Sequence, residues 1–334
     1  MTKNNTSDCA QCADGGDFCV VGVDVSKKHL DAHELPSGRS KQFENTRAGI
    51  RALRRWLCPR VRWVVYESTG SYHLPMEDAM AGDLPLSRQN PKRVKHFAKA
   101  VGMEAKTDRV DALTLARMGR ALADDLERTA PRSEWEKEVH GLCVARQASV
   151  KAKSVLKCRL EHVELPLVRR EIKRDIKRGE RQIARYDAEL ERLAAENPEF
   201  SRKVRLLTSI KGVRAPTAIV LLTELPELGT LTSRRAASLA GLAPVARDSG
   251  ERQGQRSIRN GRKRARTALY MSAMSAVRWV PSLREAHSAR TERGMKRKAS
   301  LIAVMRKLVV IANAILRDGE PFRDGHVPQA PSPA

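Results

Sequence analysis

Two apolar stretches of this chain each end in an acidic residue, and this pattern constrains the fold more than any other feature. The run 19–23 is followed by Asp24, and the run 61–66 is followed by Glu67. Short runs rich in valine and aromatic residues are typical of buried strands. In open α/β sheets, functional side chains gather where the strands end. The pattern therefore predicts a sheet that carries two carboxylates at one edge.

A second pair of acids lies in a helical pattern further along the chain. Asp108 and Asp111 are three residues apart, and residues at this spacing share one face of a helix. Four carboxylates at one place form an oxygen-only site of the kind that hard divalent cations prefer. We therefore predict that Asp24, Glu67, Asp108 and Asp111 bind Mg²⁺ or Mn²⁺ and serve as catalytic acids.

The charge of the chain indicates the substrate of such a site. There are 63 lysine and arginine residues against 39 aspartate and glutamate residues, which gives a formal net charge of +24. A polyanionic partner explains this excess most simply, because each phosphate contact releases counterions. Aromatic residues make up only 4% of the chain, which argues against recognition mainly by base stacking. A metal-binding acid cluster in so basic a chain predicts a nucleic-acid phosphodiester as substrate.

The cysteines and the apolar segments bear on the cellular compartment. Six cysteines are scattered along the chain, as is usual for reduced thiols in the cytosol. Cys9 and Cys12 have the C-x-x-C spacing and Cys19 follows, but a zinc ribbon would need a second ligand pair. No apolar run approaches the ~18 residues of a membrane span, and the N-terminus has no apolar signal region. We predict a cytoplasmic protein with no membrane partner.

The order of elements predicts an α/β domain followed by α-helical regions. Three strands precede the first helix, and they are expected at 19–23, 30–35 and 41–44. Thr46 is the expected N-cap of that helix, and strands and helices then alternate as far as the helix of Asp108. This order is typical of a ribonuclease-H-type sheet. We assign residues 1–18 to a disordered leader and 19–125 to the sheet domain.

A highly charged segment with few strand signals covers residues 130–198. Its apolar residues follow a 4–3 spacing and include Ile172, Ile176, Ile183, Leu190 and Leu193. This spacing predicts a coiled-coil-like helical linker that ends at Pro198. The seam could be closed by a hairpin within one chain or by a second copy of the chain.

Residues 199–319 are expected to form a mostly helical domain, followed by a disordered Pro/Ala/Ser-rich tail at 320–334. The segment 206–218 predicts a helix, a turn at Gly212 and a second helix. This is similar to the helix-hairpin-helix element, whose turn amides hold a phosphate without reading sequence. A second glycine usually stands at the position of Arg214, so a plain helical turn is the alternative. Arg214 could itself contact a phosphate.

A cation-rich segment follows the motif at 239–244. Its candidate nucleic-acid ligands are Arg252, Arg256, Arg259, Arg262, Lys263 and Arg264. Ser249 precedes a glycine beside these cations. Guanidinium groups would stabilise the charge that develops on a phosphate attacked by this serine. A Ser-Gly pair is also common in ordinary turns, so the residue pattern leaves both interpretations open.

Taken in order, these segments resemble the DEDD insertion-sequence transposases, the IS-one-ten family, from about residue 20 to residue 317. The matching segments are 21–27, 66–70, 106–112, 241–244 and the serine-containing basic segment 249–266. Each is ordinary by itself, whereas their order and spacing are specific. The resemblance implies a RuvC-like ribonuclease-H-fold domain, a helical coiled-coil-like linker and a mostly helical C-terminal transposase domain.

The resemblance also implies an activity, which is RNA-guided, site-specific DNA recombination. It implies that the four acids hold the metal and that Ser249 is the nucleophile, forming a phosphoserine link to DNA. Members of the family are understood to use a structured bridge RNA that pairs with donor and target DNA. A homo-oligomer, either a dimer or a tetramer, would cut several strands together. The alternatives are a metal-dependent nuclease or junction resolvase that uses water, and a non-catalytic RNA-binding protein.

Overall fold

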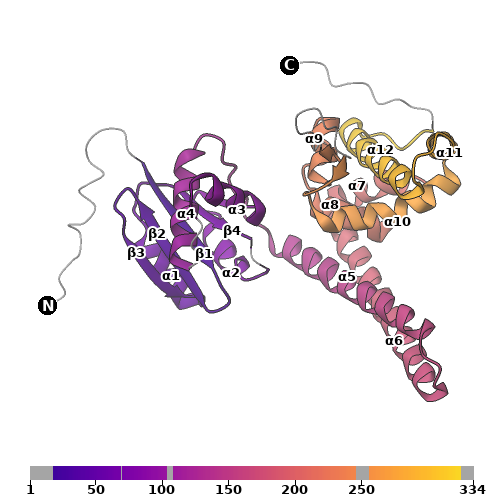
Figure 1. Ribbon diagram of the computed structural model, residues 1–334, viewed down its shortest axis with the longest axis horizontal. Helices are drawn as coiled ribbons and strands as arrows, with labels where there is room; N and C mark the ends of the chain where they lie inside the picture. The colour runs from indigo at the N-terminus through magenta and orange to yellow at the C-terminus, as the bar shows by residue number, and fades with distance from the viewer. Residues whose placement is uncertain (1–17, 69, 104–107, 246–255, 325–334) are drawn as a thin grey trace. The chain divides into compact units, whose positions relative to one another are not determined.

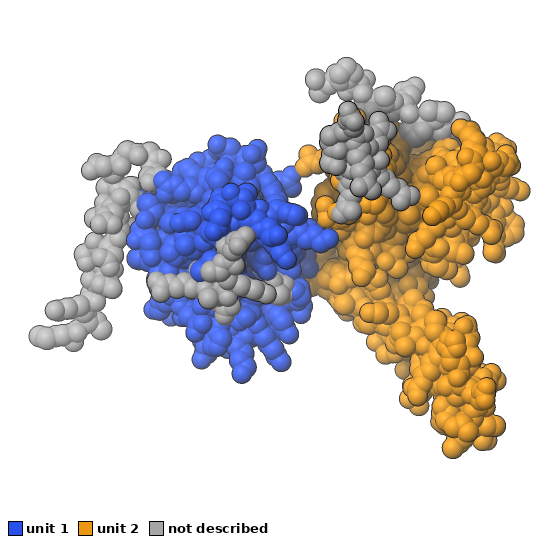
Figure 2. Space-filling model, viewed as in Figure 1, with its two compact units in different colours: residues 1–133 blue, residues 134–334 orange. Residues whose placement is uncertain are grey.

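The computed structural model describes residues 18–68, 70–103, 108–245 and 256–324, without the side chains of Asp108 and Arg109. The chain divides between Ser133 and Glu134 into two compact units, here called unit 1 and unit 2 (Figure 2). Unit 1 holds the predicted sheet, and unit 2 holds both the long helices of the predicted linker and the C-terminal helices.

Unit 1 is built on a five-stranded sheet with the strand order β3-β2-β1-β4-β5 (Figure 1). The strands are β1 (Cys19–Val25), β2 (His29–Leu35), β3 (Ser40–Glu44), β4 (Val61–Glu67) and β5 (Leu86–Gln89). Strand β2 is antiparallel to its neighbours β1 and β3, while β1, β4 and β5 are parallel. The helices are α1 (Arg47–Trp56), α2 (Leu74–Met80), α3 (Pro91–Ala100) and α4 (Asp108–Ala121).

This strand order and direction is that of the ribonuclease-H fold, so the predicted fold class is confirmed. Thr46 caps α1 as predicted, because its hydroxyl accepts the Gly49 N–H at 3.2 Å. The sequence predicts a further strand at 84–87, and the structure has it two residues later, as β5. Pro85 has no N–H to donate to the ladder, and the strand begins after it, at Leu86.

The two faces of the sheet pack against different helices. Val21, Val23 and Tyr66 belong to a core that includes residues of α1 and α2. Val20 and Val65, which alternate with them, pack against α3 and α4. Cys19 is buried in the first of these cores, whereas Cys9 and Cys12 lie outside the described residues.

Unit 2 is helical, with one short pair of strands. Its helices are α5 (Glu134–Glu161), α6 (Pro166–Glu196), α7 (Pro198–Thr208), α8 (Ala215–Glu224), α9 (Ser233–Leu239), α10 (Lys263–Trp279), α11 (Pro281–Glu292) and α12 (Arg297–Asp318). The strands β6 (Pro244–Val245) and β7 (Ser257–Ile258) pair antiparallel. Figure 1 shows α5 and α6 side by side, extending as a long hairpin from the body of unit 2.

The predicted 4–3 seam is closed within the chain. Helix α6 packs along α5, and its seam residues are at most 9% exposed: Ile172, Ile176, Ile183, Leu190 and Leu193. Of the two interpretations of the seam, the structure therefore shows the hairpin. The end of the hairpin near Val139 and Leu193 joins the core formed by α7 to α12. The linker and the C-terminal helices thus share one core.

Helix α12 is, within the described ranges, the one helix long and apolar enough to cross a membrane. The sequence predicts this helix near 299–316, with the run 301–316 apolar enough to belong to the core. Its buried residues, among them Leu308 and Val309, lie in the core of unit 2.

The segment after α12 differs from the expected disordered tail in its first residues. Phe322 packs against the core of unit 2, and its N–H donates to the Ser209 hydroxyl at 2.8 Å. Asp324 accepts hydrogen bonds from the N–H and the hydroxyl of Ser282, in the first turn of α11. These contacts hold residues 320–324 against unit 2, because an apolar ring is partly buried and a carboxylate lies at a helix N-terminus. Residues 325–334 lie outside the described part of the chain.

Candidate functional site: acids at the end of the sheet

Asp24 and Glu67 stand side by side on neighbouring parallel strands. Gly22 of β1 is in register with Val65 of β4, so the residues two positions further on also lie opposite one another. Adjacent strands are about 4.8 Å apart, and alternate residues face the same side of a sheet. Both acids therefore lie on the face covered by α4, and both are partly buried.

Two glycines let α4 lie directly on this face of the sheet. A Cβ atom at Gly22 would be 2.1 Å from the carbonyl oxygen of Ala112, and one at Gly119 would be 2.7 Å from a methyl group of Val20. Helix α4 thus runs antiparallel to β1, with its C-terminal half over the start of the strand. Its first turn is directed toward the end of β1 that carries Asp24.

The direction of α4 brings a third acid to the same end of the sheet. Asp111 directly precedes Ala112 and is partly buried. Asp108 is the first residue of α4, and its side chain lies outside the described part. The backbone therefore gathers Asp24, Glu67 and Asp111 at one end of the sheet.

The carboxylates at this end of the sheet fit a hard divalent cation, since carboxylate oxygens are the ligands that Mg²⁺ prefers. Among the described side chains, no group of three or more His, Cys, Asp or Glu residues is arranged to hold a metal ion. Converging carboxylates repel one another unless a cation screens them. The assignment of a metal to these acids accordingly stays a prediction.

A buried ionic cluster on the opposite face of β4 was missed by the sequence analysis. Glu77 of α2 is 3% exposed and accepts the hydroxyl proton of Tyr66. Its two carboxylate oxygens lie 3.3 Å from Arg88 and 3.5 Å from Arg132. Burial and the nearby Glu77 carboxylate raise the pKa of Tyr66, so this phenol stays protonated and donates. The cluster thus holds Tyr66, the residue of β4 that directly precedes Glu67.

The only sequence signal for this cluster is an acid among apolar residues. Met76, Glu77 and Met80 are all buried on α2, and a buried carboxylate requires partners. Those partners come from β4, from β5 and from Arg132, far along the chain. Such long-range pairing could not be assigned before the fold was known.

Candidate functional site: the serine-containing segment

Ser249 and Arg252 lie outside the described residues, in the segment that joins β6 to β7. The two strands are paired, with Val245 opposite Ser257. The segment therefore starts and ends at one point of unit 2, whatever its own conformation. The nucleophilic role of Ser249 stays a prediction.

Two backbone segments cross at the base of this hairpin. Gly241 and Gly261 have φ values of 68° and 67°. A Cβ atom at Gly261 would lie 2.1 Å from the Gly241 nitrogen, and one at Gly241 would lie 2.3 Å from the carbonyl oxygen of Asn260. Arg266 donates to the Asn260 carbonyl at 2.7 Å and to the Gly241 carbonyl at 3.3 Å. The contact between these two glycines, which are 20 positions apart, could not be predicted from the sequence.

We expect Gly261→Ala to destabilise unit 2 by roughly 3 kcal/mol or more, because a positive φ and a collision with backbone act together. Gly294→Ala is the matched control, since Gly294 has a φ of 84° with nothing within 4 Å of its Cβ position. It carries only the conformational cost of about 1–2 kcal/mol. Denaturant unfolding of the full chain, followed by circular dichroism, measures both. Equal losses for the two variants would show that the crossing does not constrain the backbone.

Two of the predicted nucleic-acid ligands are used inside the fold. Arg262 donates to both carboxylate oxygens of Glu227, at 2.6 and 2.5 Å, and to the carbonyl of Glu224 at 2.7 Å. Arg264 lies 3.2 Å from the Glu224 carboxylate. These pairs fix the start of α10 to the end of α8. The exposed members of the predicted set are Arg214, Arg256, Arg259 and Lys263.

Helices α7 and α8 with their turn form the predicted helix–turn–helix arrangement. Gly212 in the turn has a φ of 105°, and a Cβ atom there would be 2.7 Å from the Ala276 nitrogen of α10. Close packing on α10 is therefore sufficient reason for this glycine. Arg214 is the exposed N-cap residue of α8, and its contact with a phosphate stays a prediction.

Comparisons with known proteins identify the family of the chain. A family model of transposases, of the DEDD type named for IS110, matches residues 21–163. A second model, described as the transposase IS116/IS110/IS902 family, matches residues 204–288. The acids and their sheet fall in the first match, and the glycine crossing of Gly241 and Gly261 falls in the second. The chain is thus an enzyme that transposes DNA. It belongs to the IS110 family of insertion-sequence transposases.

Relatives extend the similarity over most of the chain. The pilin gene-inverting protein of Moraxella bovis is 28% identical over 316 residues, covering 90% of this chain and 97% of that protein. The 43.6 kDa protein of insertion element IS110 from Streptomyces coelicolor is 32% identical over 126 residues, which cover 37% of this chain and 31% of that protein. Among solved structures, T. thermophilus RuvC with a Holliday junction substrate is similar at 14% identity and a TM-score of 0.25, covering 34% of this chain and 100% of RuvC.

Proposed function

We propose that this transposase is an RNA-guided, site-specific DNA recombinase that cuts and rejoins DNA through a phosphoserine intermediate. The observation that carries the proposal is the gathering of Asp24, Glu67 and Asp111 at one end of a ribonuclease-H-type sheet. The family membership of the chain adds the fourth acid, Asp108, and the nucleophile, Ser249. The net charge of +24 is consistent with a protein that binds RNA as well as donor and target DNA.

In this mechanism Asp24, Glu67, Asp108 and Asp111 would hold Mg²⁺ or Mn²⁺, which would stabilise charge on the scissile phosphate. The Tyr66–Glu77 hydrogen bond keeps the end of β4, and with it Glu67, in place. The Ser249 hydroxyl attacks the phosphorus, and a DNA hydroxyl leaves as the bond to it breaks. The proton of the serine passes to a base. Exposed cations at the end of the segment, Arg256 and Arg259, stabilise the developing negative charge.

Rejoining reverses this step without ATP. The hydroxyl of another DNA strand attacks the phosphoserine, the serine leaves, and a new phosphodiester forms. A protein that inverts a gene must rejoin every strand that it cuts, and the name of the Moraxella relative describes inversion. Recombination needs several strands cut together, so we propose that the enzyme acts as a homo-oligomer in the cytoplasm.

The test of the proposal is recombination of donor and target plasmids by the protein as purified from cells. We expect recombinants that join the two plasmids without loss of base pairs, and we expect treatment with ribonuclease to abolish them. If recombinants form equally well after ribonuclease treatment, the reaction does not need a guide RNA. Linear cleavage products without joining would indicate a nuclease.

We also expect binding to weaken steeply with salt. The variant Arg256→Gln/Arg259→Gln/Lys263→Gln removes the exposed cations of the basic segment and spares Arg262 and Arg264, which hold acids of α8 and of the segment after it. We expect the dependence of log affinity on log salt to fall by up to about 2.7, or about 0.9 for each lost contact with a duplex phosphate. Fluorescence anisotropy across a salt series measures this. Failure of the unaltered protein to bind nucleic acid at ~50 mM salt would contradict the proposed function.

A further inference from the structure

A groove on the outer face of α6 is lined almost entirely by cations. It has a volume of about 480 Å³, and its lining residues are Pro166, Arg169, Arg170, Lys173, Arg174 and Lys177. The seam residues Ile172 and Ile176 are buried on an adjacent face of the same helix. Apart from Arg169, which donates to carbonyls at the end of α5 and just beyond it, the cations therefore do not support the packing of α6 on α5.

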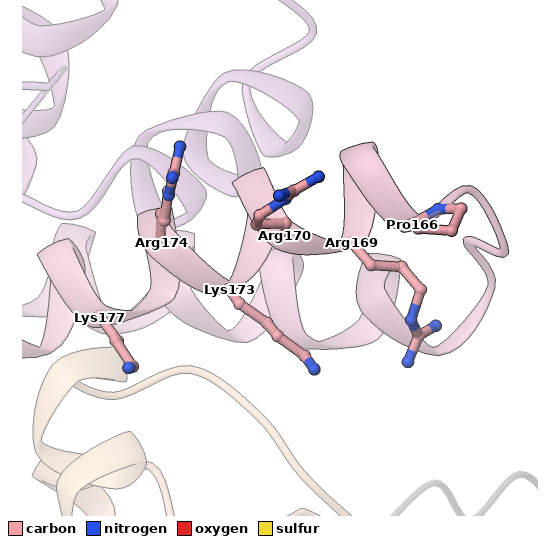
Figure 3. Close-up of a pocket in the computed structure, with 6 residues that line it drawn as sticks. All are labelled: Pro166, Arg169, Arg170, Lys173, Arg174 and Lys177. Carbon is pink, nitrogen blue, oxygen red and sulfur yellow. The ribbon is translucent and has the colours of Figure 1, made fainter.

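The cations form two ridges along the helix. Figure 3 shows Arg169, Lys173 and Lys177 extending to one side of α6, and Arg170 and Arg174 to the other. Residues four apart are one helical turn apart, about 5.4 Å along the axis. The groove between the ridges is thus open to a linear anion that could meet positive charge on either side at each turn.

The ion pairs of the hairpin leave this positive charge largely uncompensated. Arg174 pairs with Glu171 at 2.7 Å, and Arg169 donates to carbonyls at the end of α5 and just beyond it. None of the ion pairs between described residues includes Arg170, Lys173 or Lys177, and these three side chains are exposed. Clustered cations repel one another unless an anion lies between them.

The charge of the hairpin changes sign along its length. The half around the turn, residues 151–178, has ten lysines and arginines against four acids. The half next to the body of unit 2, residues 134–150 and 179–196, has five against eight. A hairpin that only needed a solvated surface would have no reason to separate charge in this way. The separation indicates an anionic partner at the turn end.

We propose that the α6 groove binds the phosphodiester backbone of a nucleic acid. The inference deepens the proposed function and rests on it for the nature of the partner. From Pro166 to Lys177 the groove follows about 17 Å of helix, and a duplex presents roughly ten phosphates over that length. Because contacts with the phosphate backbone carry no sequence information, a backbone bound in this groove is held without its sequence being read. DNA and RNA share the chemistry that it recognises.

The test compares two variants of the full chain that remove the same charge from the same helix. Lys173→Gln/Lys177→Gln alters one ridge of the groove, and Arg181→Gln/Arg185→Gln alters the next two turns, which lie outside it. All four positions are exposed, so both variants should unfold at the temperature of the unaltered protein. Anisotropy of labelled DNA duplexes and of labelled RNA duplexes is measured across a salt series.

We expect the groove variant to lose at least tenfold in affinity at roughly 0.1 M salt and to lower the salt slope by about 1.8, since each duplex phosphate contact contributes about 0.9. The control variant should lose less than half as much. A loss with DNA alone or with RNA alone supports the groove and identifies its ligand, and a loss with both supports a shared surface. An unchanged groove variant, or an equal loss in the control, overturns the proposal.

These outcomes are separate from those that test the recombination chemistry. If the groove variant binds normally while substitution of Glu67 still abolishes recombination, the groove inference fails and the proposed function stands. If the unaltered protein recombines no DNA but the groove variant alone loses affinity, the groove stands and the proposed chemistry fails.

Discussion

Ser249→Ala is expected to form no covalent protein–DNA adduct and no recombinants, while it still binds DNA and RNA. A serine hydroxyl is a poor nucleophile at neutral pH and is activated only within a built site. Alanine leaves such a site without the attacking atom, and loss of a nucleophilic serine costs a hydrolase on the order of 10⁴-fold or more in rate. A plasmid assay should therefore detect no recombinants with this variant.

A nicked suicide substrate makes this result visible. When the unaltered protein attacks beside the nick, the leaving strand diffuses away and the protein stays linked to DNA on a denaturing gel. Ser257→Ala is the matched control, because Ser257 lies at the end of the same segment, in β7, and should form the adduct normally. Clean cleavage by Ser249→Ala, with no adduct in the unaltered protein, would assign the attack to water. The protein would then be a metal-dependent nuclease or junction resolvase.

Asp24→Ala, Glu67→Ala and Asp108→Ala are each expected to abolish strand exchange with nucleic-acid binding largely intact. Each variant removes a carboxylate from the end of the sheet, and the remaining acids bind a divalent cation less tightly. The chemistry loses charge stabilisation worth several kcal/mol at the scissile phosphate. Recombination between plasmids and anisotropy with the same DNA measure the two properties separately.

Asp124→Asn is the control for this series. Asp124 lies in unit 1 and is 90% exposed, where it pairs with Arg62, and an exposed pair of this kind contributes little to stability. The control should recombine DNA at the rate of the unaltered protein. Normal turnover of the unaltered protein in excess chelator would exclude a metal ion from the mechanism and overturn the role proposed for the four acids.

The positions of the acids could be predicted because they follow from local patterns. Two valine-rich runs ending in Asp24 and Glu67 specify strands, and the spacing of Asp108 and Asp111 specifies a helix face. The order of the strands then fixes which ends meet. What the sequence did not reveal is the contact that sets the distance of α4 from the sheet. That contact depends on Gly22 and Ala112, which are 90 positions apart.

The C-terminal site was harder to predict because its geometry depends on pairs distant in sequence. In the sequence, Arg262 and Arg264 are two cations of a basic run, and nothing there indicates a partner. In the structure they pair with Glu227 and Glu224, at and just after the end of α8. The contact of Gly241 with Gly261 is of the same kind. A run of arginines shows how much charge is present, whereas the folded backbone decides which charges are used internally.

The internal closure of the α5–α6 seam has a consequence for assembly. A helix that needs a partner chain to cover its apolar stripe is folded only while that partner is present, so its stability depends on protein concentration. Here the apolar stripe of α6 is covered by α5 of the same molecule. In the oligomer that we propose, α6 would therefore keep its cover when the subunits separate. We expect the hairpin to stay folded on dilution.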